Sequence, residues 1–341
     1  MFVIDTKVKQ EALNYATLIN ALNITEHRLE PLFDKFSERA PINLPINDRV
    51  ICGLYSDYFC VPEEKLLNEY ARAFDAFSRL ECTDEIIKRG SSDYPPLLAK
   101  TEQAPRFLYI RGKKSLLYEK RTVALVGSRQ ASKDAKTNTK RLAATLGKNG
   151  IIVVSGLAKG IDVTAHITAL ENGFNTIAVI GTNLNQYYPI ENKDVQMEIE
   201  KNGLVVSQFP PSSKTQRWFF PLRNGVMSGL SLATVIMEAG ETSGALKQAD
   251  FALKQGRQII IPKSVLKNEN ITWPKKYVKM GAGVADTPMD VIKILSRNDI
   301  INVNNMEIST QQSLESYFSE IIKCQDTESK NNYSVSIGIE E

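Results

Sequence analysis

The sequence predicts an α/β fold, with an extended Rossmann-like, doubly wound parallel sheet that follows a small helical domain. Short β-branched runs recur from Arg121 onward, and helical stretches separate them. Runs that are apolar along their whole length are typical of strands buried on both faces of a parallel sheet. A ligand of such a sheet binds beyond the carboxyl ends of the strands, where the strand order reverses. The expected strands are TVALV (122–126), IIVVS (151–155), TIAVI (176–180), LVVS (204–207), LATVIM (232–237) and QIIIP (258–262).

Residues 1–90 are predicted to form the helical domain. They contain little glycine, and the stretches ALNYATLINALNI and EEKLLNEYARAFDAFSRL place apolar residues at helical spacing. Residues 91–120 are expected to be a connector, because their prolines favour extended and turn structure. The Rossmann-like domain follows over residues 121–295. Residues 296–341 are expected to form a polar tail with more acidic than basic side chains.

The composition is that of an ordinary globular protein, with 43% hydrophobic and 24% charged residues. The net charge of +3 permits a polyanionic ligand, because cations can be confined to one face. The four cysteines include no CxxC pair and there are only two histidines, so we expect no zinc site of a common type. We find neither a signal peptide nor an apolar run of the ~18 residues that a membrane helix needs. A cytoplasmic protein without membrane contact is therefore expected.

The first predicted strand ends in Gly127, Ser128 and Arg129. A glycine permits a tight turn there, and the amides at the start of the following helix can face an anion. Arg129 adds a planar, permanently charged group that suits a phosphate. A turn from strand to helix favours glycine even without a ligand, so Gly127 also has a purely structural interpretation.

The second predicted strand leads into the stretch SGLAKGID (155–162), in which two glycines bracket Lys159 at the start of a helix. Asp162 suits an N-cap or first-turn position, where exposed amides favour an acid. Ser155, Asp162 and His166 are the residue types of a hydrolase triad, but the chain has no G-x-S-x-G elbow around the serine. Packing or a local hydrogen bond is the favoured interpretation of His166.

Two further loops carry aromatic residues. Tyr187 and Tyr188 follow the third strand, where their rings can stack on bases or fasten the loop to the core. The loop over residues 207–224 is long enough to be functional, and it interleaves Lys214 and Arg217 with aromatic rings. Those rings can stack on a flexible polyanion or close an apolar lid. They belong to Trp218, Phe219 and Phe220.

The motifs of common nucleotide enzymes are missing. The chain contains no G-x-x-x-x-G-K-[ST] P-loop, and no G-x-G-x-x-G follows the first strand. No set of paired carboxylates with cysteine or histidine suggests hydrolytic metal chemistry. We therefore predict a binding protein without catalytic residues, cofactor or metal, rather than an enzyme.

In order and spacing, the stretches VALVGSR, SGLAKGID, YPIEN, FPLRN and TSGAL resemble the DprA/Smf DNA-processing family. The resemblance covers residues 91–290. It implies an extended Rossmann domain that binds single-stranded DNA in a basic pocket. It also implies a homodimer that protects incoming single-stranded DNA and loads the recombinase RecA in natural transformation or DNA uptake.

Matching these motifs position by position assigns residues to two phosphate-binding loops, to a basic wall and to a neighbouring loop that is often basic. They are Gly127, Ser128 and Arg129 in the first loop, Ser155, Gly156 and Lys159 in the second, Arg223 and Asn224 in the wall, and Lys214 in the neighbouring loop. The family commonly has a second arginine at the position of Gly225, so one cation of the usual pattern is absent from this chain.

Two other functions stay open at this point. A nucleotide sensor or a nucleoside-monophosphate hydrolase of the lysine-decarboxylase-like Rossmann group would use Glu238, directly after LATVIM, as an acid/base. The chain lacks the P-G-G-x-G-T-x-x-E pattern of that group. A protein-interaction scaffold would instead use the helical domain or the acidic tail.

Overall fold

The structure is a computed structural model that describes residues 2–297. The polar tail expected over residues 296–341 lies outside these residues, except for its first two positions. Within the described part of the chain, no helix combines the length and the apolar character that a membrane span requires.

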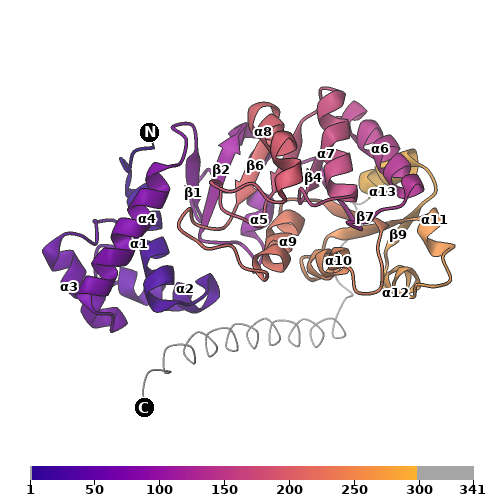
Figure 1. The fold of residues 1–341 in the computed structure, drawn as a ribbon. Coiled ribbons are helices and arrows are strands. Elements are labelled where there is room, and N and C mark those ends of the chain that lie inside the picture. The colour runs from indigo at the N-terminus through magenta and orange to yellow at the C-terminus, as the bar shows by residue number, and fades with distance from the viewer. Residues whose placement is uncertain (1, 298–341) are drawn as a thin grey trace, which may run out of the picture. The chain divides into compact units, whose positions relative to one another are not determined.

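Four helices build the predicted helical domain (Figure 1). They are α1 (Lys7–Leu22), α2 (Glu26–Ser37), α3 (Arg49–Phe59) and α4 (Glu63–Ser78). The hydroxyl of Thr6 accepts a hydrogen bond from the Lys9 amide, which satisfies a free donor at the start of α1. The core between the helices is rich in aromatic rings. Tyr15 and Phe33, for example, meet edge to face with ring centroids 5.0 Å apart.

A nine-stranded sheet follows, in the order β1-β2-β6-β5-β4-β3-β7-β8-β9. Its strands are β1 (Glu85–Lys88), β2 (Phe107–Gly112), β3 (Thr122–Gly127), β4 (Ile152–Ser155), β5 (Thr176–Val179), β6 (Leu204–Ser207), β7 (Ala233–Glu238), β8 (Gln258–Pro262) and β9 (Gly283–Ala285). All pairs from β6 to β9 are parallel. The chain moves outward from β3 to β6 and then returns to β7 on the other side of β3. This reversal confirms the doubly wound, Rossmann-like prediction.

The sheet begins before Arg121. Strands β1 and β2 form antiparallel pairs at one edge, and β2 joins the parallel strands by pairing with β6. Strand β2 has the sequence FLYIRG and is buried along its length except for Gly112. This strand lies within residues 91–120, which the sequence predicts to be a connector. The prolines before β2 favour turn and extended structure, so the sequence does not indicate a strand there.

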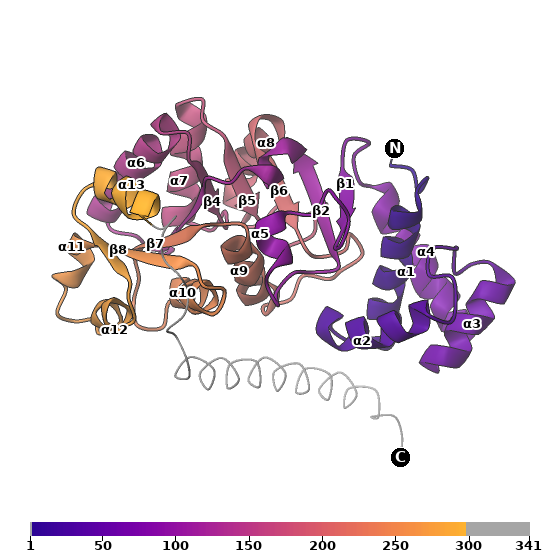
Figure 2. The same cartoon turned by 180° about the vertical axis from the view of Figure 1, so that it is seen from behind.

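Helices cover both faces of the sheet (Figures 1 and 2). Val123 and Leu125 of β3 face one layer, and the alternate residues Ala124 and Val126 face the other. The first layer contains α6 (Lys133–Lys148), α7 (Ile161–Glu171), α8 (Lys193–Asn202) and α13 (Pro288–Arg297). The second contains α5 (Pro96–Ala99), α9 (Phe219–Gly229), α10 (Gly244–Lys254) and α12 (Trp273–Lys279). The short elements are η1 (Lys114–Tyr118), η2 (Ile190–Asn192) and α11 (Lys263–Leu266).

A buried arginine ties the helical domain to the sheet. Arg106, directly before β2, is 6% exposed, and its guanidinium binds Glu30 at 3.0 Å, Glu11 at 3.2 Å and Asp34. The same side chain lies 5.0 Å from the ring centroid of Phe33. A buried cation needs such partners, because its desolvation is otherwise too costly.

We expect Arg106→Ala to destabilise the protein by about 3 kcal/mol, because it leaves Glu11 and Glu30 with fewer partners in a buried place. The matched control is Arg72→Ala, which removes an exposed ion pair with Glu69 and should cost less than about 1 kcal/mol. Urea unfolding followed by circular dichroism measures both. Equal losses in the two variants would contradict a structural role for Arg106.

Candidate nucleic-acid interface

The predicted site lies at the carboxyl edge of the sheet, where the strand order reverses between β3 and β7. Four loops leave this edge. We call them the first loop (residues 128–131, after β3), the second loop (156–160, after β4), the third loop (180–189, after β5) and the fourth loop (208–218, after β6). The first two follow neighbouring parallel strands, so they lie side by side.

The first and second loops are in direct contact. The Ile161 amide donates to the carbonyl of Ser128 at 3.3 Å. Gly160 has a φ of +81°, and a Cβ at this position would clash with the carbonyl oxygens of Ser128 and Arg129. A Cβ on Gly127 would likewise lie 2.8 Å from the Glu238 carbonyl. Glycine is therefore required at both positions for the loops to approach this closely.

Two predicted cations point into solvent from these loops. Arg129 is exposed and makes no ion pair with any residue between positions 2 and 297. Lys159 is exposed as well, and its Nζ lies 2.7 Å from the Glu191 carboxylate in a pair whose members are both more than half exposed. Such a pair contributes little to stability and can exchange partners. The structure thus brings Arg129 and Lys159 to one edge of the sheet on touching loops.

Arg223, predicted as part of a basic wall, lies beneath the second loop. Its guanidinium is buried, donates to the Gly156 carbonyl at 2.6 Å and also binds the Val179 carbonyl. A Cβ on Gly156 would overlap this guanidinium. Arg223 therefore joins the ends of β4 and β5 from below, which its sequence position does not reveal.

Asp162 compensates the buried charge of Arg223. Its carboxylate accepts hydrogen bonds from the amides of Gly156 at 3.1 Å and Ala158 at 3.4 Å. Burial raises the pKa of Asp162 to about 6 and lowers that of Arg223 to about 10, while the charge of each opposes the shift of the other. The first-turn structural role predicted for Asp162 agrees with these contacts.

Two more predicted site residues are buried. The Ser155 hydroxyl donates to the Leu125 carbonyl at 2.6 Å, and the Asn224 amide donates to the Gly244 carbonyl at 3.3 Å. Lys214, in contrast, is exposed on the fourth loop. The predicted residues thus divide into those that face solvent and those that support the loops from within.

The hydrolase triad has no counterpart in the geometry. His166 is fully buried and its Nδ1 lies 2.8 Å from the Thr176 hydroxyl. Burial lowers the pKa of His166 to about 3, so the ring is neutral at physiological pH. Because the Ser155 hydroxyl binds a carbonyl, these residues form no chain from nucleophile to base to acid.

Glu238 closes the first loop. Its carboxylate accepts hydrogen bonds from the Ser132 amide at 3.0 Å and from the Ser132 hydroxyl at 2.6 Å. The Ser132 hydroxyl also accepts from the Ala135 amide and caps α6. The sequence suggests only an acid/base role for Glu238, because no sequence pattern pairs it with a residue 106 positions away.

Aromatic rings continue the site along the third and fourth loops. Tyr188 is 51% exposed, and its ring centroid lies 5.1 Å from that of Phe220. Phe209 and Phe219 stack at 3.8 Å and anchor the fourth loop in the interior. Trp218 is half-buried. Phe209 and Phe219 thus agree with an apolar anchor, whereas stacking of the exposed Tyr188 ring on bases stays a prediction.

Gly225 does not face this edge. A Cβ at this position would approach Gln103 at 2.9 Å and Phe251 at 3.4 Å, on the side of α9 that packs against α10. The arginine that is absent here therefore leaves no gap between the exposed cations of the first and second loops.

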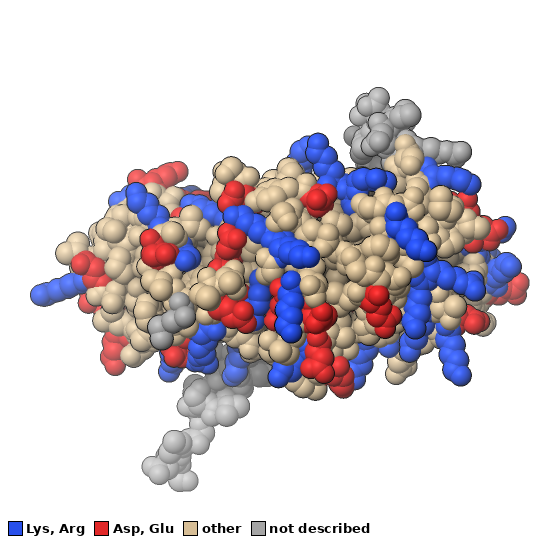
Figure 3. Space-filling view, turned by 90° about the horizontal axis from the view of Figure 1, so that it is seen from above, with Lys and Arg blue, Asp and Glu red and all other residues tan. Residues whose placement is uncertain are grey.

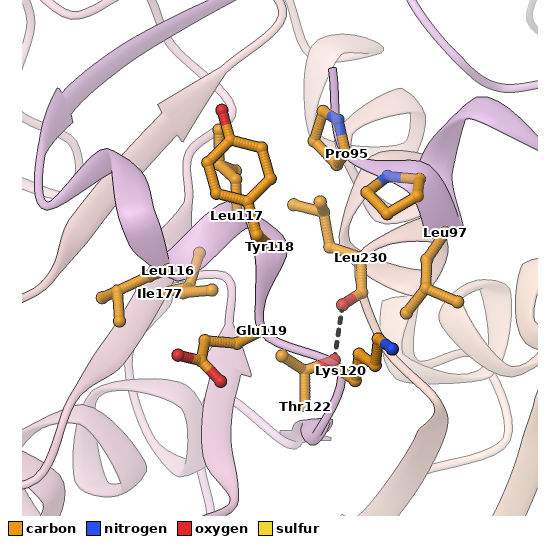
Figure 4. A pocket seen from close by; sticks show the side chains of 11 residues that line it. Pro95, Leu97, Leu116, Leu117, Tyr118, Glu119, Lys120, Thr122, Ile177 and Leu230 are labelled. Carbon is orange, nitrogen blue, oxygen red and sulfur yellow. Dashed lines mark hydrogen bonds between the residues drawn. The ribbon is translucent and has the colours of Figure 1, made fainter. Parts of the chain in front are cut away.

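A small pocket lies elsewhere, near the amino ends of β3 and β5 (Figure 4). Its lining is mostly apolar, and the Thr122 hydroxyl donates to the Leu230 carbonyl at 2.7 Å beside it. None of the predicted site residues lines this pocket.

We expect Gly160→Ala to destabilise the protein by about 2 kcal/mol or more, because alanine at a positive φ also clashes with the first loop. Gly240→Ala is the control, since a Cβ there meets no atom within 4 Å. Thermal unfolding compares the two. A Gly160→Ala protein as stable as the control would show that the loops do not need this approach.

His166 is expected to make the protein acid-sensitive. Its pKa is depressed in the folded state, so the unfolded chain binds an extra proton as pH falls below about 6.5, and stability is lost. Between pH 7 and pH 4, the wild type should lose about 3 kcal/mol more than His166→Gln. The control is His27→Gln, which changes the exposed histidine of α2. Equal pH slopes in wild type and His166→Gln would contradict this assignment.

Comparisons with known proteins agree with this geometry. The family model of DNA recombination-mediator protein A matches residues 85–296. DNA processing protein DprA of Streptococcus pneumoniae is 37% identical over 210 residues, which are 61% of this chain and 70% of that protein. Protein Smf of Escherichia coli is 33% identical over 211 residues, which are 62% of this chain and 56% of that protein.

Solved structures agree as well. The DprA structure from S. pneumoniae matches with a TM-score of 0.67 and 28% identity, and covers 86% of this chain and 98% of its own. DNA processing protein A from Helicobacter pylori, a structure described for its single-stranded DNA binding mode, matches with a TM-score of 0.56 and 27% identity over 63% of this chain and 96% of its own. The motifs, the strand order and these matches agree, and the chain belongs to the DprA/Smf family of DNA recombination-mediator proteins.

Proposed function

We propose that this protein binds single-stranded DNA at the carboxyl edge of its sheet. The observation that carries the proposal is the exposure of Arg129 and Lys159 on two touching loops at the point where strand order reverses. A phosphate there can meet both cations. The relative from H. pylori, described for its single-stranded DNA binding mode, supports the same ligand.

Bases would lie toward the third and fourth loops. Tyr188 offers a half-exposed ring that Phe220 supports from behind, and Lys214 lies exposed on the fourth loop. Stacking on aromatic rings requires unpaired bases and tolerates any sequence. Phosphate contacts at the cations and base stacking on the aromatic rings together predict a preference for single-stranded over duplex DNA and little sequence specificity.

The buried residues would act through the shape of the loops. Gly127, Ser128 and the two exposed cations form the contact surface in this proposal. Ser155, Gly156, Arg223 and Asn224 would instead hold the loops in position, because their polar groups already form hydrogen bonds within the protein.

We also propose a non-enzymatic role for this site. In residues 2–297, no group of three or more His, Cys, Asp or Glu side chains is arranged to hold a metal ion. The Glu238 carboxylate is engaged by Ser132. From its membership of the DprA/Smf family, we further propose that the protein is a cytoplasmic homodimer that protects incoming single-stranded DNA and hands it to a recombinase such as RecA. Release of base from nucleoside monophosphates, lost in Glu238→Gln, would overturn this non-catalytic role.

Arg129→Ala is expected to weaken binding of any single-stranded oligonucleotide by about tenfold, because one charge-assisted phosphate contact is lost. The slope of log affinity against log salt should become shallower by about 0.7. Arg49→Ala, which removes an exposed arginine from α3 of the helical domain, is the control and should change neither value. Fluorescence anisotropy at several salt concentrations measures both. Unchanged affinity in Arg129→Ala and Lys159→Ala would refute the site.

A further inference from the structure

Helix α6 carries a face of unpaired cations. Lys133, Lys136, Lys140 and Arg141 are exposed along it, at positions that share one side of a helix. We call these four residues the α6 basic face. The opposite side of α6 is apolar and packs into the interior. Figure 3 looks onto the helix layer that contains α6, and many Lys and Arg side chains project from this face of the molecule.

These charges are not neutralised by the described part of the protein. None of the four residues forms an ion pair with a residue between positions 2 and 297, whereas Lys114, for example, binds both Glu85 and Asp93 at 2.7 Å. Asp134 is the only acid within α6. Like charges three or four positions apart destabilise a helix by a few tenths of a kcal/mol per pair.

The placement of the cations also opposes the helix dipole. Lys133 is the first residue of α6 and Lys136 lies in its first turn, where a positive charge is disfavoured. Asp134 in the first turn and the Glu238 carboxylate that binds Ser132 offset part of this unfavourable placement, but neither forms an ion pair with Lys133 or Lys136. A bound polyanion would compensate the mutual repulsion of the four cations, which no ion pair among residues 2–297 relieves.

The α6 basic face continues directly from the proposed binding site. Arg129 precedes Lys133 by four positions, and the bonds between Ser132 and Glu238 fix the start of α6 to the carboxyl edge. From Lys133 to Lys140 the helix advances about 10 Å. A stacked strand carries one phosphate per about 3.4 Å, so this length faces about three phosphates.

We propose that the α6 basic face is a track for the single strand as it leaves the carboxyl-edge site past Arg129. This inference rests on the proposed function and extends it. Arg129 and Lys159 would hold phosphates within the site, and the α6 basic face would hold the next phosphates of the same strand. The contacts would be to the backbone, so the track would read no sequence.

The test is a triple variant, Lys133→Gln, Lys136→Gln and Lys140→Gln, in the full-length protein. Glutamine keeps the helix propensity of lysine while it removes the charge. The matched control is Lys275→Gln, Lys276→Gln and Lys279→Gln in α12, which makes the same change in net charge at exposed positions of the other helix layer. Each protein is titrated with a single-stranded oligonucleotide of about 6 nucleotides and one of about 30, because single-strand sites span roughly 4–16 nucleotides.

We expect the α6 variant to bind the long oligonucleotide at least about tenfold more weakly, with a salt slope shallower by about 2. Binding of the short oligonucleotide should stay the same, and the α12 control should bind both like the wild type. The melting temperature of the α6 variant should not fall, because repulsion within the helix is relieved.

Other outcomes overturn the inference. Equal losses in the α6 variant and the α12 control would mean that only net charge matters. Unchanged binding of the long strand would exclude the track, and so would a loss confined to duplex DNA or to an acidic protein. If wild type binds neither oligonucleotide, the proposed function itself fails, which this design separates from failure of the track alone.

Discussion

The candidate site depends on one buried contact, the guanidinium of Arg223 beneath Gly156. Arg223 joins the ends of β4 and β5 through two carbonyl oxygens, and Asp162 supplies the opposite charge that makes its burial tolerable. The second loop packs on this pair of side chains. Gly160 lets that loop approach the first loop closely, because it has no Cβ. The buried charges of Arg223 and Asp162 therefore help to position the exposed cations Arg129 and Lys159 at the edge of the sheet.

The sequence predicted the parallel strands, because strands buried on both faces are apolar throughout. It also placed the candidate site at their carboxyl ends, which share one edge of the sheet. It did not predict β2 as a strand, since prolines precede that segment. It also could not separate exposed from buried site residues. The sequence around an arginine does not show whether its side chain lies on the surface of a loop or is buried beneath it. The contact of Arg223 with Gly156 joins positions 67 residues apart, so no local pattern indicates it.

The modest net charge of +3 conceals an uneven distribution. Many cations near the helical domain are paired with acids, as in the bidentate contact of Arg111 with Asp84 at 2.7 Å. Cations at the carboxyl edge and on α6 lack such partners or hold weak, exposed ones. A field of this kind attracts a polyanion to one region of the surface, although the average composition shows no excess.

The helical domain also supports the site. The Asn185 side chain in the third loop donates to the Ala76 carbonyl of α4 at 2.9 Å, and Asn20 of α1 binds Ser212 in the fourth loop at 3.2 Å. The third loop carries Tyr188, which is assigned to the bases, and the fourth loop carries the exposed Lys214. Since Arg106 fixes the helical domain to β2, these contacts brace two of the four loops from outside the sheet. Loops that are ordered before binding lose less conformational freedom when a flexible strand arrives, so the domain would raise affinity without touching DNA.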